Sequence, residues 1–285
     1  MKNKTNTVVF ESVDAFLTQA QKPATKGNDP HSSKPTTGPR STWDMGADWD
    51  ETLRLARDGW AKGLKRITDK RELLEIPESS DKSIQPQPIP AQAGDEVDVG
   101  LYLSGEPECM IEYQPEIIPS FGKVARIIVN LTSSCNVKAE TYFQRGAAAS
   151  LLVDALENCG IRCEVWGVFA YGGYGRRNNL INSHWWVPVK AADEPLEMDR
   201  LAFLLAHPAT FRRLSFRLIE QLPRKQFKDN HESGYGSCME IPTEEREADG
   251  TIYFDRQHSG YRTPEEMQKA IDDTLSKFLG EEVAA

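Results

Sequence analysis

The stretch that decides the fold is VARIIVNLTSS, residues 124–134. It begins as a compact apolar run of the kind that is buried on both faces in a parallel sheet, and the run stops at Asn130. After a polar loop, apolar residues recur at helical spacing over residues 143–159, and Gly160 stands where a left-handed helix cap belongs. Residues 163–170 are a second apolar run. Strand, helix and strand with short connections predict a right-handed βαβ unit.

Two unusual loops follow these two predicted strands, at residues 130–134 and 171–177. Because the carboxyl ends of parallel strands meet at one edge of a sheet, we expect the two loops to be neighbours at a ligand site. In the second loop, Tyr171 and Tyr174 are suited to stacking on rings, and Arg176 and Arg177 are suited to binding phosphate or carboxylate. A plain Gly-rich turn is the alternative interpretation.

Several segments together resemble a von Willebrand factor A (VWA) domain. Asn130-Leu-Thr-Ser-Ser134 is similar to the Asp-x-Ser-x-Ser motif of that family. With it, Arg145-Gly-Ala-Ala-Ala, residues 156–169 and Arg212-Arg-Leu resemble the VWA domain of large cobaltochelatase-type subunits, over about one third of the chain. The resemblance implies a Rossmann-like, VWA-type α/β fold with a mostly parallel sheet flanked by helices. It also implies a partnership with a MoxR-type AAA+ ATPase.

The VWA motif binds Mg²⁺ through oxygen ligands, which a hard cation prefers. Thr132 and Ser134 keep the hydroxyls, and Asp199 lies roughly where the family has its later aspartate, so the resemblance implies a partial metal site from these three residues. Asn130 replaces the anionic carboxylate with a neutral amide, and the family's threonine after the second strand falls near Tyr171. We therefore expect a degenerate metal site with reduced Mg²⁺ affinity; ordinary turn and helix-capping roles are the alternative.

The chain divides into three predicted parts. Residues 1–42 are expected to be a disordered or loosely docked tail, because residues 22–42 are rich in Lys, Pro, Thr, Ser and Gly. Residues 43–120 are expected to hold a helix from Asp48 to about Leu64, then a Pro-rich linker at 84–94, then a β-hairpin within 97–113. Residues 121–285 are expected to form the VWA-like domain.

That last part should contain helices near residues 198–206 and 209–222 and a C-terminal helix. The C-terminal helix has a capping box, with Thr263 as N-cap, Pro264 at the first position and Glu266 at the third. The tryptophans Trp43, Trp49 and Trp60 should anchor the N-terminal segment on this domain, since buried aromatics contribute a large apolar area.

Composition limits the function. The formal net charge of -9 argues against a surface built mainly for nucleic acid. The five scattered cysteines include no CxxC pair, which indicates reduced thiols and a cytoplasmic protein, in the host cytoplasm if a phage encodes it. No run is long enough to span a bilayer, so no membrane partner is expected. There is no P-loop, no HExxH and no GxSxG motif, so no catalytic residues can be named.

Three functions follow from these patterns. The first is a non-enzymatic VWA-like adaptor for a protein partner, whose binding edge consists of Asn130, Ser133, Tyr171, Tyr174, Arg176 and Arg177. The second is a phage accessory protein that binds nucleic acid or nucleotide through Arg176, Arg177, Arg212 and Arg213. It is suggested by a similarity to bacteriophage proteins with a Trp-rich segment like residues 43–60. The third is an enzyme of unassigned reaction.

Overall fold

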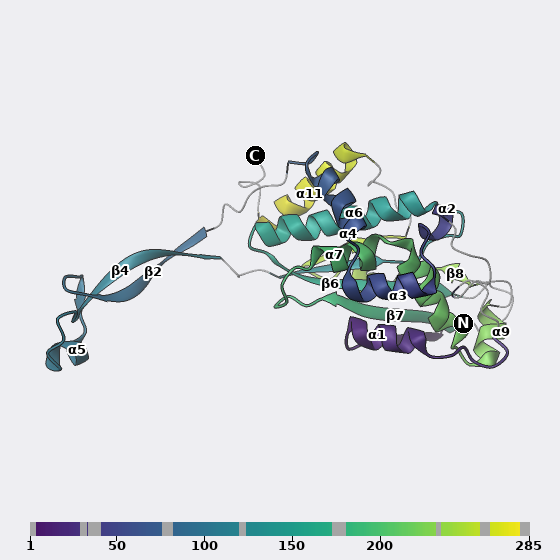
Figure 1. Cartoon of the computed structure of the whole chain (residues 1–285), viewed down its shortest axis with the longest axis horizontal. Helices are drawn as coiled ribbons and strands as arrows, with labels where there is room; N and C mark the ends of the chain where they lie inside the picture. Colours follow the sequence, from purple (N-terminus) through teal and green to yellow (C-terminus); the bar gives the residue numbers. More distant parts are fainter. Residues whose placement is uncertain are drawn as a thin grey trace.

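A computed structural model of the chain describes residues 4–28, 33, 41–75, 82–119, 124–172, 181–231, 235–256 and 263–279. Its centre is a sheet of order β1-β7-β6-β5-β9, with β8 added beside β6 (Figure 1). The strands are β1 (Lys4–Val9), β5 (Val124–Asn130), β6 (Arg162–Gly172), β7 (Ile181–Lys190), β8 (Ser237–Cys238) and β9 (Thr251–Phe254). Three of the five strand pairs are parallel, while β7 and β8 run antiparallel to β6. The predicted α/β fold, a mostly parallel sheet flanked by helices, is confirmed.

The βαβ unit forms as its apolar pattern predicts. β5 lies between β6 and β9, so both of its edges are paired, and Ile127, Ile128 and Val129, which point to alternating faces, are fully buried. The connecting helix α6 (Ala139–Asn158) runs between two parallel strands, and Gly160 follows it with a φ of 76°. A positive φ at this position favours glycine because other residues clash there.

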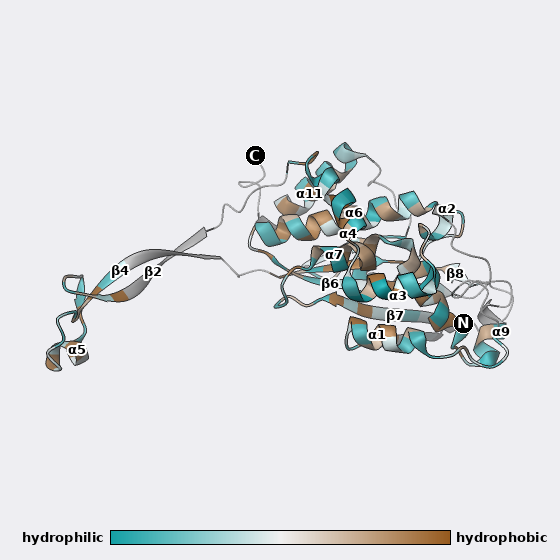
Figure 2. Cartoon of the chain, in the orientation of Figure 1, coloured by the Kyte–Doolittle hydropathy of each residue, from teal (hydrophilic) through white to brown (hydrophobic). Residues whose placement is uncertain are grey.

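Most of the other helices of the body pack on the face of the sheet that carries Ile127 and Val129. The predicted helices at 198–206 and 209–222 are confirmed, and each includes a π-helical stretch. These two segments are α7 (Met198–Leu201) with η1 (Ala202–Ala206), and η2 (Thr210–Ser215) with α8 (Phe216–Glu220). Buried residues of α6, η1, η2 and α8 belong to one hydrophobic core with Ile127 and Val129. Figure 2 shows the hydrophobic residues of α6 and β7 within this body.

The N-terminal segment was predicted to be disordered or loosely docked; residues 4–28 are docked, and residues 29–32 and 34–40 lie outside the described residues. β1 extends the sheet in parallel with β7, and α1 (Val13–Gln21) buries four apolar side chains, among them Phe16, whose ring centroid lies 5.7 Å from that of Phe169. Residues 4–28 are thus part of the folded body. The sequence left both outcomes open because the apolar partners of this segment, such as Phe169, are far along the chain.

The helix predicted from Asp48 to Leu64 is two helices. As predicted, Asp48 caps the first, α3 (Trp49–Asp58), and its carboxylate accepts from the Glu51 N–H at 2.8 Å. Gly59, with a φ of 84°, then turns the chain into α4 (Ala61–Arg71). The short helix α2 (Ser41–Asp44) precedes them. Trp43 and Trp60 pack against Phe216 and Phe143 of the body, as the anchoring prediction requires.

A narrow ribbon projects from the body (Figure 1). It contains β2 (Lys82–Ala91), β3 (Glu96–Val97), α5 (Val99–Leu103) and β4 (Met110–Pro119) in a sheet of order β2-β4-β3. Most of the predicted linker at 84–94 is therefore a paired strand. We call residues 82–119 the arm. The predicted hairpin forms between β3 and β4, but residues 99–103 are helical because Asp98 accepts from the N–H groups of Gly100 and Leu101.

The C-terminal helix is confirmed as α11 (Pro264–Leu279), and its N-cap Thr263 accepts from the Glu266 N–H at 3.3 Å. Met267 and Ile271 belong to the predicted apolar stripe and are buried in the common core. Two short helices, α9 (Arg224–His231) and α10 (Thr243–Arg246), complete the described elements. Within the described residues, no helix combines the length and apolar character needed to cross a membrane.

Candidate functional site

At the end of β5, where the sequence predicts a metal site, the Asn130 side chain is fully engaged in hydrogen bonds with other parts of the protein. The Asn130 carboxamide oxygen accepts from both the N–H and the hydroxyl of Thr132, at 3.1 and 2.6 Å. Its nitrogen donates to the Met239 carbonyl at 2.9 Å and to the Tyr253 hydroxyl at 3.0 Å. Asn130 and Thr132 are both fully buried. An aspartate could not make the two donated bonds, so the amide fits a role in fastening this loop to residues 239–253.

Asp199 lies away from this loop. It is in the first turn of α7, which follows the carboxyl end of β7, and β7 runs antiparallel to β6. Its neighbour Arg200 reaches Asp14 of α1 at 4.0 Å, and α1 follows the carboxyl end of β1, which is parallel to β7. Asp199 is therefore at the opposite end of the sheet from Thr132 and Ser134, so the predicted set of three metal ligands is corrected.

The remaining oxygens at the loop do not fit Mg²⁺ well. The Asn130 oxygen is already engaged by Thr132, Ser134 is exposed, and no carboxylate of the predicted set is present. Mg²⁺ is usually held by one or two carboxylates. Throughout the described ranges, no group of three or more His, Cys, Asp or Glu side chains is placed to hold a metal ion.

The second predicted loop begins inside the protein. Tyr171 is 2% exposed, and its hydroxyl lies 2.7 Å from the Ser215 Oγ. Burial raises the pKa of Tyr171 well above its ordinary value, and its ring stacks with Phe211. Ser133 is also buried. Of the predicted binding edge, Asn130, Ser133 and Tyr171 are thus inside the protein, whereas Tyr174, Arg176 and Arg177 lie outside the described residues.

Three arginines are completely buried. Arg212 and Arg213 were predicted to bind phosphate, whereas Arg145 had no predicted binding role. Arg213 forms an ion pair with Asp44 at 2.6 Å, and Arg212 donates to the carbonyls of Trp43 and Val137. Arg145 donates to the Asn130 carbonyl. These guanidinium groups join the N-terminal segment and the β5 loop to the body, so Arg212 and Arg213 are not accessible to nucleic acid.

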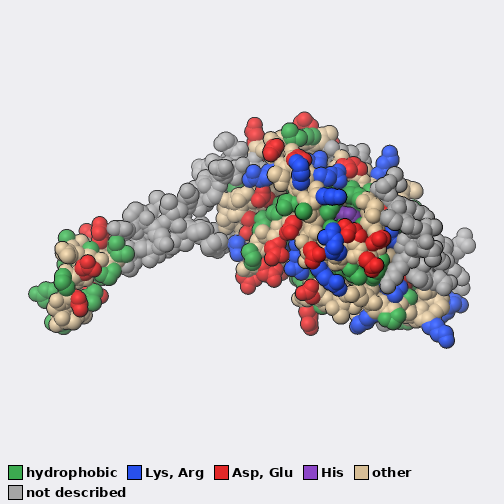
Figure 3. Space-filling view, viewed as in Figure 1, with side chains coloured by type: hydrophobic (Ala, Val, Ile, Leu, Met, Phe, Trp, Pro, Cys, Tyr) green, Lys and Arg blue, Asp and Glu red, His purple; other side chains and the backbone are tan. Residues whose placement is uncertain are grey.

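The most exposed apolar residues of the described chain include four at the far end of the arm. Val97, Val99, Tyr102 and Leu103 are 48%, 63%, 64% and 79% exposed. Between Lys82 and Lys123 the sequence contains seven acidic residues and no Lys or Arg. Figure 3 shows hydrophobic and acidic side chains together there, and no basic ones on the visible face. We call residues 95–108 the arm tip.

The whole chain, including the arm, matches a single family model. This model is described as a domain of unknown function, DUF7192, and it matches residues 2–281. The chain belongs to the DUF7192 family. No curated protein and no solved structure matched it. The matched range includes both the arm and the body.

Sequence reasoning missed the arm tip in this DUF7192 protein. Residues 97–103 alternate apolar and polar positions, and such a pattern usually describes a strand with one buried face. Nothing in the described structure covers that apolar set. A run of acidic residues without Lys or Arg would be unusual around a buried strand. This run was therefore the signal in the sequence that residues 97–103 are exposed.

Proposed function

We propose that this protein is a non-enzymatic binding subunit, an adaptor, and that the arm tip is its contact with a protein partner. The observation that carries the proposal is the exposure of Val99, Tyr102 and Leu103 at the end of a ribbon that projects from the body (Figures 1 and 3). Contiguous exposed apolar residues rimmed by polar groups are typical of interaction sites. Tyrosine is also among the residues that carry most binding energy at interfaces.

The charge of the arm tip defines the kind of partner. Asp95, Glu96, Asp98, Glu106 and Glu108 surround the apolar residues, and no base is present among residues 83–122. Charges across interfaces are arranged to be complementary, and like charges opposite one another are unfavourable. The partner surface that fits is therefore an apolar groove with a basic rim.

The same features do not favour nucleic acid as the partner. An acidic tip repels phosphates, and Arg212 and Arg213 are buried. The resemblance of residues 126–169 to cobaltochelatase-type VWA subunits makes a MoxR-type AAA+ ATPase of the same cell the first partner to test.

The test is a binding measurement between this chain and that purified ATPase, with ATP, with ADP and without nucleotide. The double variant Tyr102→Ser/Leu103→Ser should weaken binding at least about ten-fold, as expected for the loss of two interface anchors. The matched control is Leu73→Ser, because Leu73 is 66% exposed but lies on the body. Added salt should weaken binding of the original chain as well.

Two results would contradict the proposal. One is equal binding by the tip variant and the Leu73→Ser control, since the contact would then lie elsewhere. The other is a failure to bind any protein of the native cell in a crosslinking experiment with a photoreactive residue at position 103.

A further inference from the structure

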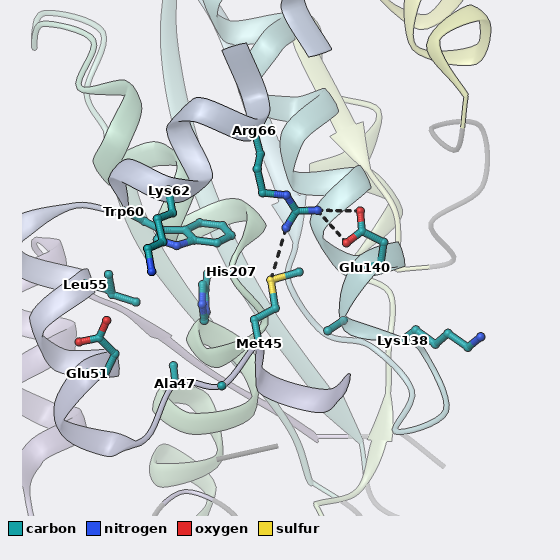
Figure 4. Close-up of a pocket in the computed structure, with 12 residues that line it drawn as sticks. Met45, Ala47, Glu51, Leu55, Trp60, Lys62, Arg66, Lys138, Glu140 and His207 are labelled. Atoms are coloured by element: carbon teal, nitrogen blue, oxygen red, sulfur yellow. Dashed lines mark hydrogen bonds and ion pairs between the residues drawn. The ribbon is translucent and has the colours of Figure 1, made fainter. Parts of the chain in front are cut away.

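The body has two surfaces that the proposed function does not use. The first is a cavity of about 730 Å³ beside Trp60, bordered by α3, α4 and the start of α6 (Figure 4). Lys62 ends near Glu51, and Lys138 extends away from the cavity, so the charges around it do not define a ligand. The second surface is the outer edge of β1, and this edge defines its partner more closely.

β1 is an edge strand of the central sheet. It pairs with β7 in parallel over its whole length, from Lys4 opposite Ile181 to Val9 opposite Trp186, and the register contains no bulge. No other described strand pairs with β1, and residues 5–9 are all exposed. Such an edge presents a row of unpaired backbone N–H and C=O groups.

The backbone groups that face outward belong to Thr5, Thr7 and Val9. The Phe10 N–H donates to the Trp186 carbonyl of β7 at 2.9 Å. Backbone groups of successive strand residues alternate between the two sides of the strand, so Phe10 and every second residue before it bond to β7. The residues between them direct their N–H and C=O groups away from the sheet. All three keep their N–H because none is a proline.

β1 lacks the features that usually protect an exposed edge. Natural edge strands are blocked by proline, by charged side chains or by a bulge. Residues 5–9 read Thr-Asn-Thr-Val-Val and contain none of these. By contrast, β2 of the arm has prolines at 86, 88 and 90. Val8 and Val9 are 37% and 59% exposed, so an added strand would also cover apolar side chains.

The outer edge of β1 is complementary to itself. In an antiparallel pair of two β1 strands centred on Thr7, this residue is opposite Thr7 of the second copy, and Thr5 is opposite Val9. The two residues of such a pair exchange two N–H···O=C bonds, and Thr–Thr is a favourable cross-strand pair. No charged side chain is present among residues 5–9 to oppose a like charge. A second copy of this chain is therefore the occupant that fits the edge.

We propose that the protein forms a two-fold symmetric dimer in which β1 pairs in antiparallel fashion with β1 of a second copy. The two central sheets then form one continuous sheet. A two-fold contact uses the same patch on both subunits, as this edge does. The dimer does not depend on the arm tip.

The mass of the full chain, measured by sedimentation equilibrium over a range of concentrations, tests the proposal. We expect a dimer whose fraction rises with concentration. Thr7→Pro should raise the dissociation constant at least about ten-fold, because it removes an outward N–H and leaves the pairing of β1 with β7 intact. The matched control is Thr7→Ala, which changes the same side chain, keeps the N–H and should still dimerise.

A charge exchange tests the register without a proline. Thr7→Lys and Thr7→Glu each place like charges opposite one another in a homodimer, so each variant alone should dimerise more weakly than Thr7→Ala. An equimolar mixture of the two should dimerise more tightly than either alone, because opposite charges then meet at position 7.

Any of three results would overturn the proposal. The chain could remain monomeric at about 100 µM, which is also the result expected if β1 pairs with a strand of another protein. Thr7→Pro could dimerise as tightly as Thr7→Ala, which would assign the contact to another surface. The mixture of Thr7→Lys and Thr7→Glu could associate no more tightly than the separate variants, which would exclude the register centred on Thr7.

Discussion

Replacing Asp44 with Asn should lower the free energy of unfolding by about 3–5 kcal/mol, the usual effect of breaking a buried ion pair. Asp44 Oδ2 lies 2.6 Å from Arg213 Nη2, and the two side chains are 0% and 1% exposed. Asn keeps the shape and the oxygen that accepts from the Gly46 N–H at 2.9 Å. The loss therefore comes from removing the negative charge beside the Arg213 guanidinium, which is buried from water.

Urea unfolding followed by circular dichroism measures this loss. Arg213→Met should cost a similar amount, because it leaves the Asp44 carboxylate buried. The double variant Asp44→Ala/Arg213→Met removes both charges and should be more stable than the sum of the two single losses predicts. Asp69→Asn is the control, since Asp69 belongs to an exposed pair with Lys65. If Asp44→Asn were no more destabilising than Asp69→Asn, or if the double variant showed the full sum, the reasoning would be refuted.

Three further outcomes follow from burial. Gly146→Ala should destabilise the protein by about 1–3 kcal/mol in urea unfolding despite the better helix propensity of alanine, because a Cβ there would overlap the η1 backbone. The folded-state pKa of His207 is lowered to about 3 by burial, so the unfolded chain binds a proton more readily between pH 6.5 and 3. Stability is thus lost as pH falls through that window, and His207→Phe should make the loss shallower by up to about 1.4 kcal/mol per pH unit. Iodoacetamide should label exposed Cys135 and spare Cys163, whose pKa burial raises to about 12, and peptide mass spectrometry checks this.

The βαβ unit could be predicted because its signals are local. The run that ends at Asn130 is apolar on both faces, and burial on both faces is what the centre of a parallel sheet requires. Gly160 similarly marks the end of α6 through its own backbone preference. Such features do not depend on residues far along the chain, so they survive in the folded structure unchanged.

The role of the β5 loop could not be predicted, because it depends on distant partners. Asn130 is bound by Met239 and Tyr253, which lie 109 and 123 positions further along the sequence. A polar residue after a strand can be an exposed ligand or a buried crosslink, and only those partners decide between the two. The cavity beside Trp60 escaped prediction for the same reason, since its border comes from residues 45–66, 138–140 and 207.

The prolines of the arm lie where they leave the pairing of β2 with β4 intact. In the β2–β4 register, Pro86 is opposite Pro115 and Pro90 is opposite Ile111. The Ile111 carbonyl accepts from the Asp95 N–H, on the β3 side, so Ile111 and every second residue from it direct their backbone groups away from β2. Pro86, Pro88 and Pro90 therefore lack an N–H only on the outer edge of the ribbon. β2 keeps its bonds to β4, whereas an added strand would meet no N–H donor at these three positions. The outer edge of β2 is therefore poorly suited to the addition of another strand.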